Sequence, residues 1–498
     1  MSASTKTPHR IRAVRAIVVA LVFLASACGT RLPDSAFVAA GEQTGATGAR
    51  AGAKTTGAGA AGAASTGSTG PAAAGAGGAG GGGAAAGGGG GADGPNQASD
   101  VGVSENELVI GNITAQDGIL GAAFKPTLLG LQAWVDSVND AGGIHGRKIR
   151  LETCNDKEDR TRTLQCAQDL VENKKVFAFI ANNTRSEGAA APYIASKNIP
   201  VIDNPITNAP YRYPDYFSIY GTPCPRDGNT VCGNDQSRNT SSVYRWFKQN
   251  LNVSKAAVFY YTGVAESEQA ANFTQKGLQL EGYSVNMYGV LLGNPSFDQG
   301  VQEAQSNGTE IIFDTIDDGA NRKLCDTMQR YGLQVKAKVS TVVAYGDAVG
   351  TDFSDICRNV VYIGGSSVTY SDQSNPQVKA FRDAFATYQP GAQLHEWSLE
   401  GWEAGVLLND YLTQAGPAPT RQGFLDFMNG LKDYTFQGLA APTTWQQGDV
   451  NAATTHDCFT VAQWSDQAGG WVQRTPAPGY QCYDDAFQFR TPVAERGD

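Results

Sequence analysis

Between about residues 101 and 489, short buried-type strands alternate regularly with amphipathic helices. In the first half, apolar runs of strand length are ELVIGNIT, KIRLETCND, VFAFIA and PVIDNP, at residues 107–114, 148–156, 176–181 and 200–205. Stretches of helical periodicity separate these runs, with short connections. This order predicts a parallel sheet that is covered by helices on both faces.

The first helix shows the pattern most clearly. Pro126 suits the first turn of a helix, and Gly142 with Gly143 suits its end. An apolar face follows the i, i+3, i+4, i+7 spacing at Leu131, Trp134, Val135 and Val138. We therefore expect a helix that begins near Pro126 and packs this face on the sheet.

The same alternation starts again in the second half of the chain. Strands are predicted at residues 256–261, 310–316, 339–345 and 360–366, and helices at 265–280 and 321–331. A folded part of this length is too long for one core, so we expect two domains.

Three blocks of sequence, taken in their order, carry a family resemblance. They are AGGIHGRKIRLETCND, VFAFIANNTRSEGAAAPYIASKNIPVIDNPIT and KAAVFYYTGVAESEQAANFTQKGLQLEGYSV. They resemble the type I periplasmic-binding-protein family, in the leucine-binding-protein-like branch that serves ABC importers of branched-chain amino acids and related compounds. The A-G-G-I-x-G-R-K-I run is a fairly specific signature, and the match extends over roughly residues 107–473.

The resemblance implies an α/β protein of two Rossmann-like lobes, each with a parallel sheet, joined by three crossings of the chain. A ligand would lie in the cleft between the lobes, outside the carboxyl ends of the strands. The expected division is residues 101–240 and 367–432 for lobe 1, 241–366 and 433–490 for lobe 2, and 491–498 for a tail.

In lobe 1 the resemblance places ligand contacts on loops after strands. Asn183 and Thr184 align with a Ser/Ser or Ser/Thr pair that holds a ligand carboxylate beside a helix N-terminus. Thr207 matches a second binding-loop threonine, and Gln116 with Asp117 occupies the first loop. The alternative for Asn183 and Thr184 is simple capping of their own helix.

In lobe 2, Asp317 and Asp318 follow a strand at a place where an acidic group often holds a ligand ammonium. The alternative is a solvated turn or a helix cap. Tyr345 is a further candidate for the cleft wall. Ala265 stands where the family has a tyrosine, which puts the branched-chain amino acid assignment in doubt.

Eight cysteines lie beyond Cys28, and an even number in an exported chain suggests disulfides. Eight cysteines allow 105 pairings. Since they fall into neighbouring couples, our hypothesis is Cys154–Cys166, Cys224–Cys232, Cys325–Cys357 and Cys458–Cys482. The alternative is buried free thiols.

The N-terminal region predicts export and a lipid anchor. Four basic residues and a short apolar run precede Ala25-Ser26-Ala27-Cys28, which resembles the bacterial lipobox. Residues 1–27 would be a signal peptide and Cys28 the lipidated residue, anchoring the protein outside the cytoplasm. The alternative is an ordinary secretory signal, cut near Ala27. Residues 28–100 are Gly/Ala-rich and predict a linker without a fold of its own.

Several function classes are disfavoured. The net charge of −10 argues against nucleic acid as a partner. No G-x-S-x-G, H-E-x-x-H or Walker A motif occurs in the folded part, so we expect no enzyme and no cofactor. Scattered histidines and the absence of a C-x-x-C pair argue against a metal. We expect a monomer that delivers a small molecule to an ABC permease, or alternatively a receptor that presents its bound state to a membrane partner.

Overall fold

The structure is a computed structural model that describes residues 94–117, 121–204, 206, 209–221, 226–227, 230–231, 236–445 and 452–492. Several sequence predictions fall outside these residues: the signal peptide, Cys28, most of the linker, Thr207, Cys224 and Cys232. In the described part, no helix is long and apolar enough to cross a membrane.

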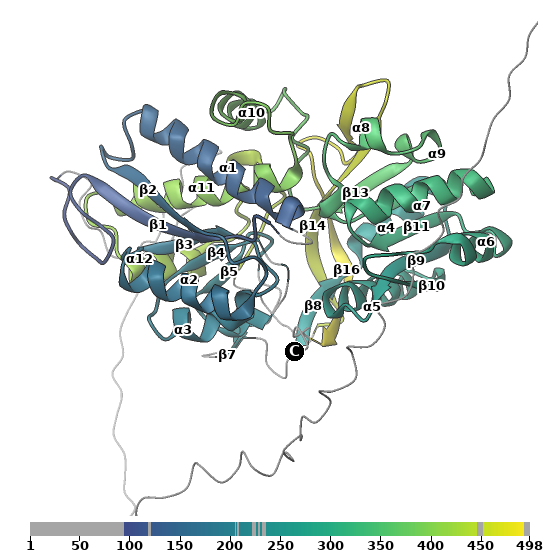
Figure 1. Cartoon of the computed structure of the whole chain (residues 1–498), viewed down its shortest axis with the longest axis horizontal. Coiled ribbons are helices and arrows are strands. Elements are labelled where there is room, and N and C mark those ends of the chain that lie inside the picture. Colours follow the sequence, from purple (N-terminus) through teal and green to yellow (C-terminus); the bar gives the residue numbers. More distant parts are fainter. Residues whose placement is uncertain are drawn as a thin grey trace, which may run out of the picture. The chain divides into compact units, whose positions relative to one another are not determined.

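The first sheet has the strand order β2-β1-β3-β4-β5, and all of its pairs are parallel. Its strands are β1 (Glu107–Ile113), β2 (Lys148–Cys154), β3 (Ala178–Asn182), β4 (Val201–Asp203) and β5 (Tyr216–Ser218). Helices α1 (Gly121–Asp140) and α11 (Glu396–Ala415) pack together on one face. Helices α2 (Arg160–Glu172) and α3 (Ala191–Ala195) cover the other face (Figure 1). The sequence prediction of a parallel sheet covered on both faces is confirmed.

Alternate residues of β1 explain why the strand reads as a continuous apolar run. Leu108 and Ile110 belong to the core beneath α1 and α11. Val109 and Ile113 belong to the core on the α2 side. Both faces of the strand are therefore buried, as expected for a parallel sheet between two helical layers.

The second sheet has the order β10-β9-β11-β12-β13-β14-β16-β8, with β15 paired to β14. Its strands are β8 (Gln236–Thr240), β9 (Lys255–Thr262), β10 (Ser284–Leu291), β11 (Ile311–Thr315), β12 (Ala337–Ser340), β13 (Val361–Gly365), β14 (Thr454–Ser465), β15 (Gly470–Gln473) and β16 (Gln481–Pro492). The strands from β10 to β13 are parallel, whereas β14, β15, β16 and β8 are added in antiparallel fashion. The antiparallel half was not predicted from the sequence.

The remaining helices follow the chain order. They are α4 (Ser242–Leu251), α5 (Ala265–Leu280), α6 (Asp298–Ser306), α7 (Asp318–Tyr331), α8 (Val349–Asp352), α9 (Asp355–Arg358), α10 (Pro376–Tyr388) and α12 (Arg421–Gly430). A short hairpin, β6 (Arg226–Asp227) with β7 (Thr230–Val231), lies between β5 and β8.

The chain passes between the two sheets three times: after β5, after β13, and between α12 and β14. These are the three crossings implied by the family resemblance. Because β8 pairs with β16 in the second sheet, we now place the first crossing before β8 rather than after residue 240. The other lobe boundaries remain a proposal.

Three expectations about segment ends are wrong. Helix α1 starts at Gly121, so Pro126 lies inside the helix rather than in its first turn. The strand expected at residues 339–345 ends at Ser340, and a 3-10 turn over Val342–Ala344 follows. Strand β16 continues through Pro492, so the tail begins later than residue 491.

The linker also ends earlier than residue 100. The backbone N–H of Gln97 donates to the carbonyl oxygen of Pro417 at 2.9 Å, and Ser99 Oγ donates to Pro419 at 2.6 Å. The buried guanidinium of Arg147 donates to the Gln97 carbonyl oxygen at 3.0 Å. These bonds attach the segment to the first lobe, because Arg147 needs acceptors that the segment supplies.

Three of the disulfides expected from the sequence are present: Cys154–Cys166, Cys325–Cys357 and Cys458–Cys482. The first ties β2 to α2, the second ties α7 to α9, and the third joins the paired strands β14 and β16. Each therefore joins neighbouring elements of one lobe.

Candidate functional site between the lobes

The carboxyl ends of the parallel strands in the first sheet carry polar side chains. Asn183 follows β3 and Asn204 follows β4, and both are buried, whereas the exposed Tyr220 comes two residues after β5. In an open parallel sheet this edge is where ligands bind. The candidate site is therefore built from these strand ends and from the segments of the second lobe that face them.

Asn183 and Thr184 are fully buried and already have partners within their own lobe. Asn183 Nδ2 donates to Thr127 Oγ1 at 2.7 Å, and Thr184 Oγ1 donates to Asp156 Oδ2 at 2.6 Å. Thr184 Oγ1 also accepts from the backbone N–H of Ser186 at 3.1 Å. Both side chains are thus held rigidly at the end of β3, and their contact with a ligand stays a prediction.

The first loop is more exposed. The backbone N–H of Gln116 donates to Asn155 Oδ1 at 3.1 Å, and Asp117 lies 3.4 Å from Lys157 Nζ. Gln116 is half-buried and Asp117 is exposed.

On the second lobe, the two predicted acids stabilise helix α7 and its surroundings. Asp317 is its N-cap, with Oδ1 accepting from the backbone N–H of Ala320 at 3.1 Å, and it also accepts from the Tyr261 hydroxyl. Asp318 pairs with Arg322 one turn later. The helix-cap alternative therefore holds for Asp317, and neither acid is without a partner.

Tyr345 is buried at the end of the 3-10 turn after β12. Its ring contacts those of Tyr370 and Trp471, with centroids 5.6 and 4.5 Å away. Burial and the nearby Glu396 carboxyl raise the pKa of its phenol well above the usual range, so it stays neutral.

An ion pair joins the two lobes beside the strand ends. Arg185, the residue after Thr184, donates to both carboxylate oxygens of Glu266 at 3.0 and 3.3 Å. Glu266 lies in the first turn of α5, next to Ala265. Only 15% of the Arg185 side chain and 11% of the Glu266 side chain are exposed. Sequence reasoning missed this pair because its members are 81 residues apart.

Helix α11 carries three buried carboxyl groups that sequence reasoning also missed. Glu396, Glu400 and Glu403, here named the glutamate row, are only 1–3% exposed. Their spacing of four and three residues places them on one side of the helix. The available signal was three acids at this spacing within an otherwise apolar helix, EWSLEGWEAGVLL.

Both lobes contact the glutamate row. From the first lobe, Asn204 Nδ2 donates to Glu400 Oε2 at 2.7 Å, and the Tyr220 hydroxyl lies 2.8 Å from both Glu400 oxygens. Ser367, which follows β13 of the second sheet, donates to Glu403 Oε2 at 3.0 Å. The backbone N–H of Glu396 donates to the Tyr345 carbonyl oxygen at 2.9 Å.

Burial makes ionisation of these carboxyls unfavourable. It raises the pKa of Glu400 to about 7, against the lowering effect of the Tyr220 and Asn204 hydrogen bonds. It also raises the pKa of Glu396 and of Glu403, with repulsion from the neighbouring glutamates as the second cause.

His395 fixes the start of the helix that carries the row. Its Nδ1 accepts from the backbone N–H of Trp397 at 3.1 Å, which leaves Nε2 to donate to the Val343 carbonyl oxygen at 3.1 Å. Burial lowers the pKa of this imidazole to about 4, so it is neutral near pH 7 and suits both roles.

A family model described as periplasmic binding protein matches residues 107–470. The chain belongs to the periplasmic binding protein family. The match includes both sheets as far as the start of β15, and it confirms the resemblance found in the sequence blocks.

The curated relatives of this periplasmic binding protein match only in part. Leu/Ile/Val-binding protein homolog 1 of Brucella melitensis is 23% identical over 202 residues, which are 40% of this chain and 51% of that protein. The protein of the same name from Brucella abortus matches over the same shares of each chain. The chain thus spans about half the length of the curated relatives it matches.

Solved structures resemble the fold over nearly their whole length. A putative branched-chain amino acid ABC transporter protein from Rhodospirillum rubrum has 17% identity and a TM-score of 0.54, covering 74% of this chain and 99% of its own. A fatty acid ABC transporter substrate-binding protein from Thermomonospora curvata has 16% identity and a TM-score of 0.58, covering 78% and 94%. An ABC transporter solute binding protein from R. palustris, solved with benzoate, has 14% identity and a TM-score of 0.57, covering 76% and 97%. They confirm the two-lobed α/β fold.

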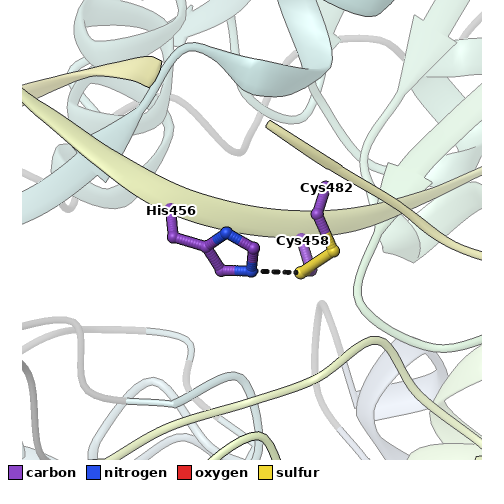
Figure 2. A group of neighbouring side chains, drawn as sticks. All are labelled: His456, Cys458 and Cys482. Atoms are coloured by element: carbon purple, nitrogen blue, oxygen red, sulfur yellow. Dashed lines mark hydrogen bonds between the residues drawn. A yellow bond between two sulfur atoms is a disulfide. The ribbon is translucent and has the colours of Figure 1, made fainter. Parts of the chain in front are cut away.

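A separate group in this periplasmic binding protein lies on the ladder of β14 and β16, where Figure 2 shows the His456 ring directed at the disulfide. His456 Nε2 is 3.2 Å from Cys458 Sγ, and His456 Nδ1 is 2.6 Å from Asp484 Oδ1. Side chains of His, Cys, Asp and Glu can bind metal ions. Among the described residues, one group of three of these side chains has its ligand atoms within 4.8 Å of one another: His456, Cys458 and Cys482. Because both sulfurs are in the disulfide, the group has no thiolate to offer a metal while that bond is intact.

Proposed function

We propose that this protein is an extracytoplasmic solute-binding protein that captures a small polar organic molecule between its lobes and delivers it to an ABC importer. The observation that carries the proposal is the Arg185–Glu266 pair, which joins the lobes beside the strand ends where this fold binds ligands. Lobes that meet through ion pairs and hydrogen bonds can separate and close again, and a ligand shifts that equilibrium by preferring the closed state. Catalysis has no part in the proposal.

The named relatives and neighbours support two classes of ligand, organic acids and amino acids. The named relatives and neighbours bind or transport branched-chain amino acids, fatty acids or benzoate. Asn183, Thr184 and Thr207 are our proposed contacts for an anionic or carbonyl end, with Gln116, Asp117 and Tyr345 at the cleft wall. Because Ala265 begins α5 without an aromatic ring, we do not assign a branched-chain amino acid.

We also propose that lipid at Cys28 anchors the mature monomer to the outer face of the cell membrane. The sequence before Cys28 supports this anchor, and the Gly/Ala-rich segment after it would let the folded part turn toward a permease. Replacing Cys28 by Ser is expected to move the protein from the membrane fraction to the soluble fraction. Unchanged processing and unchanged membrane association would contradict the anchor.

A thermal-shift screen of metabolites on the purified chain, followed by calorimetry of each hit, tests the binding function. A ligand at a hundredfold excess over its Kd is expected to stabilise the protein by about 2.7 kcal/mol. The control is Glu105→Gln, a change at an exposed position of the first lobe. Failure of every class of small molecule to bind would contradict the proposal.

A further inference from the structure

The glutamate row places three carboxyl groups on one buried face of α11, which is unusual for acidic side chains. Removing an ionised carboxylate from water is costly unless hydrogen bonds or an opposite charge compensate for it. Here three such groups lie within two turns of one helix, and each is at least nine-tenths buried.

Hydrogen bonds compensate for only part of this cost. Both oxygens of Glu400 have donors close by, but Glu396 Oε2 and Glu403 Oε1 have no hydrogen-bond partner among the described residues. In the same part of the chain, no cationic side chain forms an ion pair with any member of the row. The row therefore has acceptor capacity that the described protein does not use.

A second observation, from the other lobe, points to the same place. The hydroxyl of Tyr345 is buried and has no hydrogen-bond partner among the described residues. It belongs to the segment after β12, where the Tyr345 carbonyl oxygen accepts from the Glu396 backbone N–H at 2.9 Å. The segment that carries this hydroxyl is thus joined directly to the first residue of the row.

The spacing of the row favours an extended occupant over a single ion. Seven residues of helix separate Glu396 from Glu403, which is about 10 Å along the axis. The three glutamates do not form a group with ligand atoms within 4.8 Å of one another, as a single metal ion would need. Tyr220 links the row to the surface, since it is 39% exposed and its hydroxyl lies 2.8 Å from Glu400 Oε1.

We propose that Glu396, Glu400 and Glu403 bind the cationic part of the ligand, an extended organic molecule that carries amine or guanidine nitrogens. This inference rests on the proposed function and names the substrate class for the same interlobe site. Ammonium or guanidinium N–H groups would donate to Glu396 Oε2 and Glu403 Oε1, and the Tyr345 hydroxyl would accept from the same nitrogens. The acids expected from the sequence to hold an ammonium, Asp317 and Asp318, are engaged by α7 and by Arg322.

The test uses the full mature chain and calorimetry with three sets of probes of matched length: linear α,ω-diamines of four to six carbons, the corresponding diols, and the corresponding dicarboxylates. An ω-guanidino amine extends the cationic set. We expect the wild type to bind a cationic probe at least a hundredfold more tightly than the matched diol.

Two variants and a control complete the design. Glu396→Gln and Glu403→Gln are each expected to weaken binding of the cationic probe at least tenfold, whereas the exposed Glu105→Gln keeps wild-type affinity. Thermal unfolding of each variant checks that it is folded. If a variant does not fold, the affinities of the wild type for the cationic, neutral and anionic probes still test the inference.

Each outcome decides something. Binding of only diols or dicarboxylates, or cation binding that neither variant weakens, overturns the cationic site while leaving the solute-binding function in place. Failure of all the probes, together with failure of the metabolite screen, overturns both.

Discussion

The strand end at Thr184 and the glutamate row of α11 solve the burial of polar groups in opposite ways. At the strand end, the Thr184 hydroxyl donates to Asp156 and accepts from the backbone N–H of Ser186 in the same lobe. In the row, two carboxylate oxygens have no partner among the described residues. A polar group with a partner stiffens the scaffold, whereas one without a partner marks a place where something else can bind.

The largest effect on stability is expected from removing Asp156, the acceptor for the Thr184 hydroxyl. Asp156 is buried and accepts from the hydroxyls of Thr163 and Thr184 at 2.7 and 2.6 Å. Asp156→Ala removes the acceptor of the Thr184 hydroxyl, one of the two acceptors of the Thr163 hydroxyl and the acceptor of the Glu158 backbone N–H. The free energy of unfolding, measured by urea denaturation, should therefore fall by about 3 to 4 kcal/mol. Asp169→Ala, at an exposed position of α2, is the control and should change it by less than about 0.5 kcal/mol. Equal effects of the two changes would contradict this account of the strand end.

The glutamate row should make stability without ligand depend on pH. A carboxyl whose pKa rises from 4.5 to about 7 on folding binds more protons in the native state, so stability falls as the pH rises between these values. For Glu400 the loss is up to about 3 kcal/mol, and Glu400→Gln should remove that part of the slope. The measurement is urea denaturation of both proteins from pH 4.5 to 7.5.

Other titratable groups around the row act equally in both proteins. Tyr220, Tyr345 and Tyr434 have raised pKa values and remain neutral over this range. Burial lowers the pKa of His395 from 6.5 to about 4, so the unfolded state binds more protons and His395 makes stability rise with pH between these values. Because His395 is present in both proteins, the difference between their slopes reports Glu400. Glu396 and Glu403 contribute in the same direction as Glu400. If the free energy of unfolding of the wild type and of Glu400→Gln depended on pH with the same slope, folding would not disfavour the ionised form of Glu400.

The interlobe ion pair should have an intermediate effect. A double-mutant cycle on Arg185→Met and Glu266→Gln is expected to give a coupling free energy of about 1 to 2 kcal/mol, since both side chains are largely buried. Small-angle scattering should show a larger radius of gyration for the double variant without ligand. A coupling near zero with unchanged scattering would mean that the pair does not hold the lobes together.

The smallest effect is expected at Asp318. Its i,i+4 pair with Arg322 is partly exposed, so Asp318→Asn should cost about 0.5 kcal/mol or less. Calorimetry with the ligand found in the screen should give nearly wild-type affinity. A loss of tenfold or more would return Asp318 to the role in ammonium binding that the sequence suggested.

The architecture could be predicted because it depends on local patterns. Buried parallel strands read as apolar runs, and the helix predicted at residues 265–280 matches α5 at both ends. The expected start at Pro126 was wrong because α1 takes in the preceding residues from Gly121, although proline is usually confined to the first turn. Strand β14 pairs with β13, and β16 pairs with β8, across about 100 and about 250 residues of sequence, and no local pattern identifies such partners.

The candidate site was less predictable for the same reason. The family resemblance directed attention to strand ends, where Asn183 and Thr184 are buried, whereas Asp317 and Asp318 are half-buried and Asp117 is exposed. Arg185 and Glu266 are ordinary charged residues until the fold brings them together. The glutamate row was overlooked because an apolar helix suggests packing, and only tertiary burial gives its three acids their significance.

The place of β16 in the second sheet bears on how the protein matures. Since synthesis runs from the N-terminus, β8 emerges about 240 residues before the strand that lies between it and β14. Until β16 arrives, β8 has no neighbour in the sheet and β14 presents a bare edge, which is the kind of surface that chaperones shield from aggregation. The second lobe is therefore completed only when almost the entire chain is available, so a nascent or prematurely truncated product would have an unfinished sheet and no mature ligand cleft.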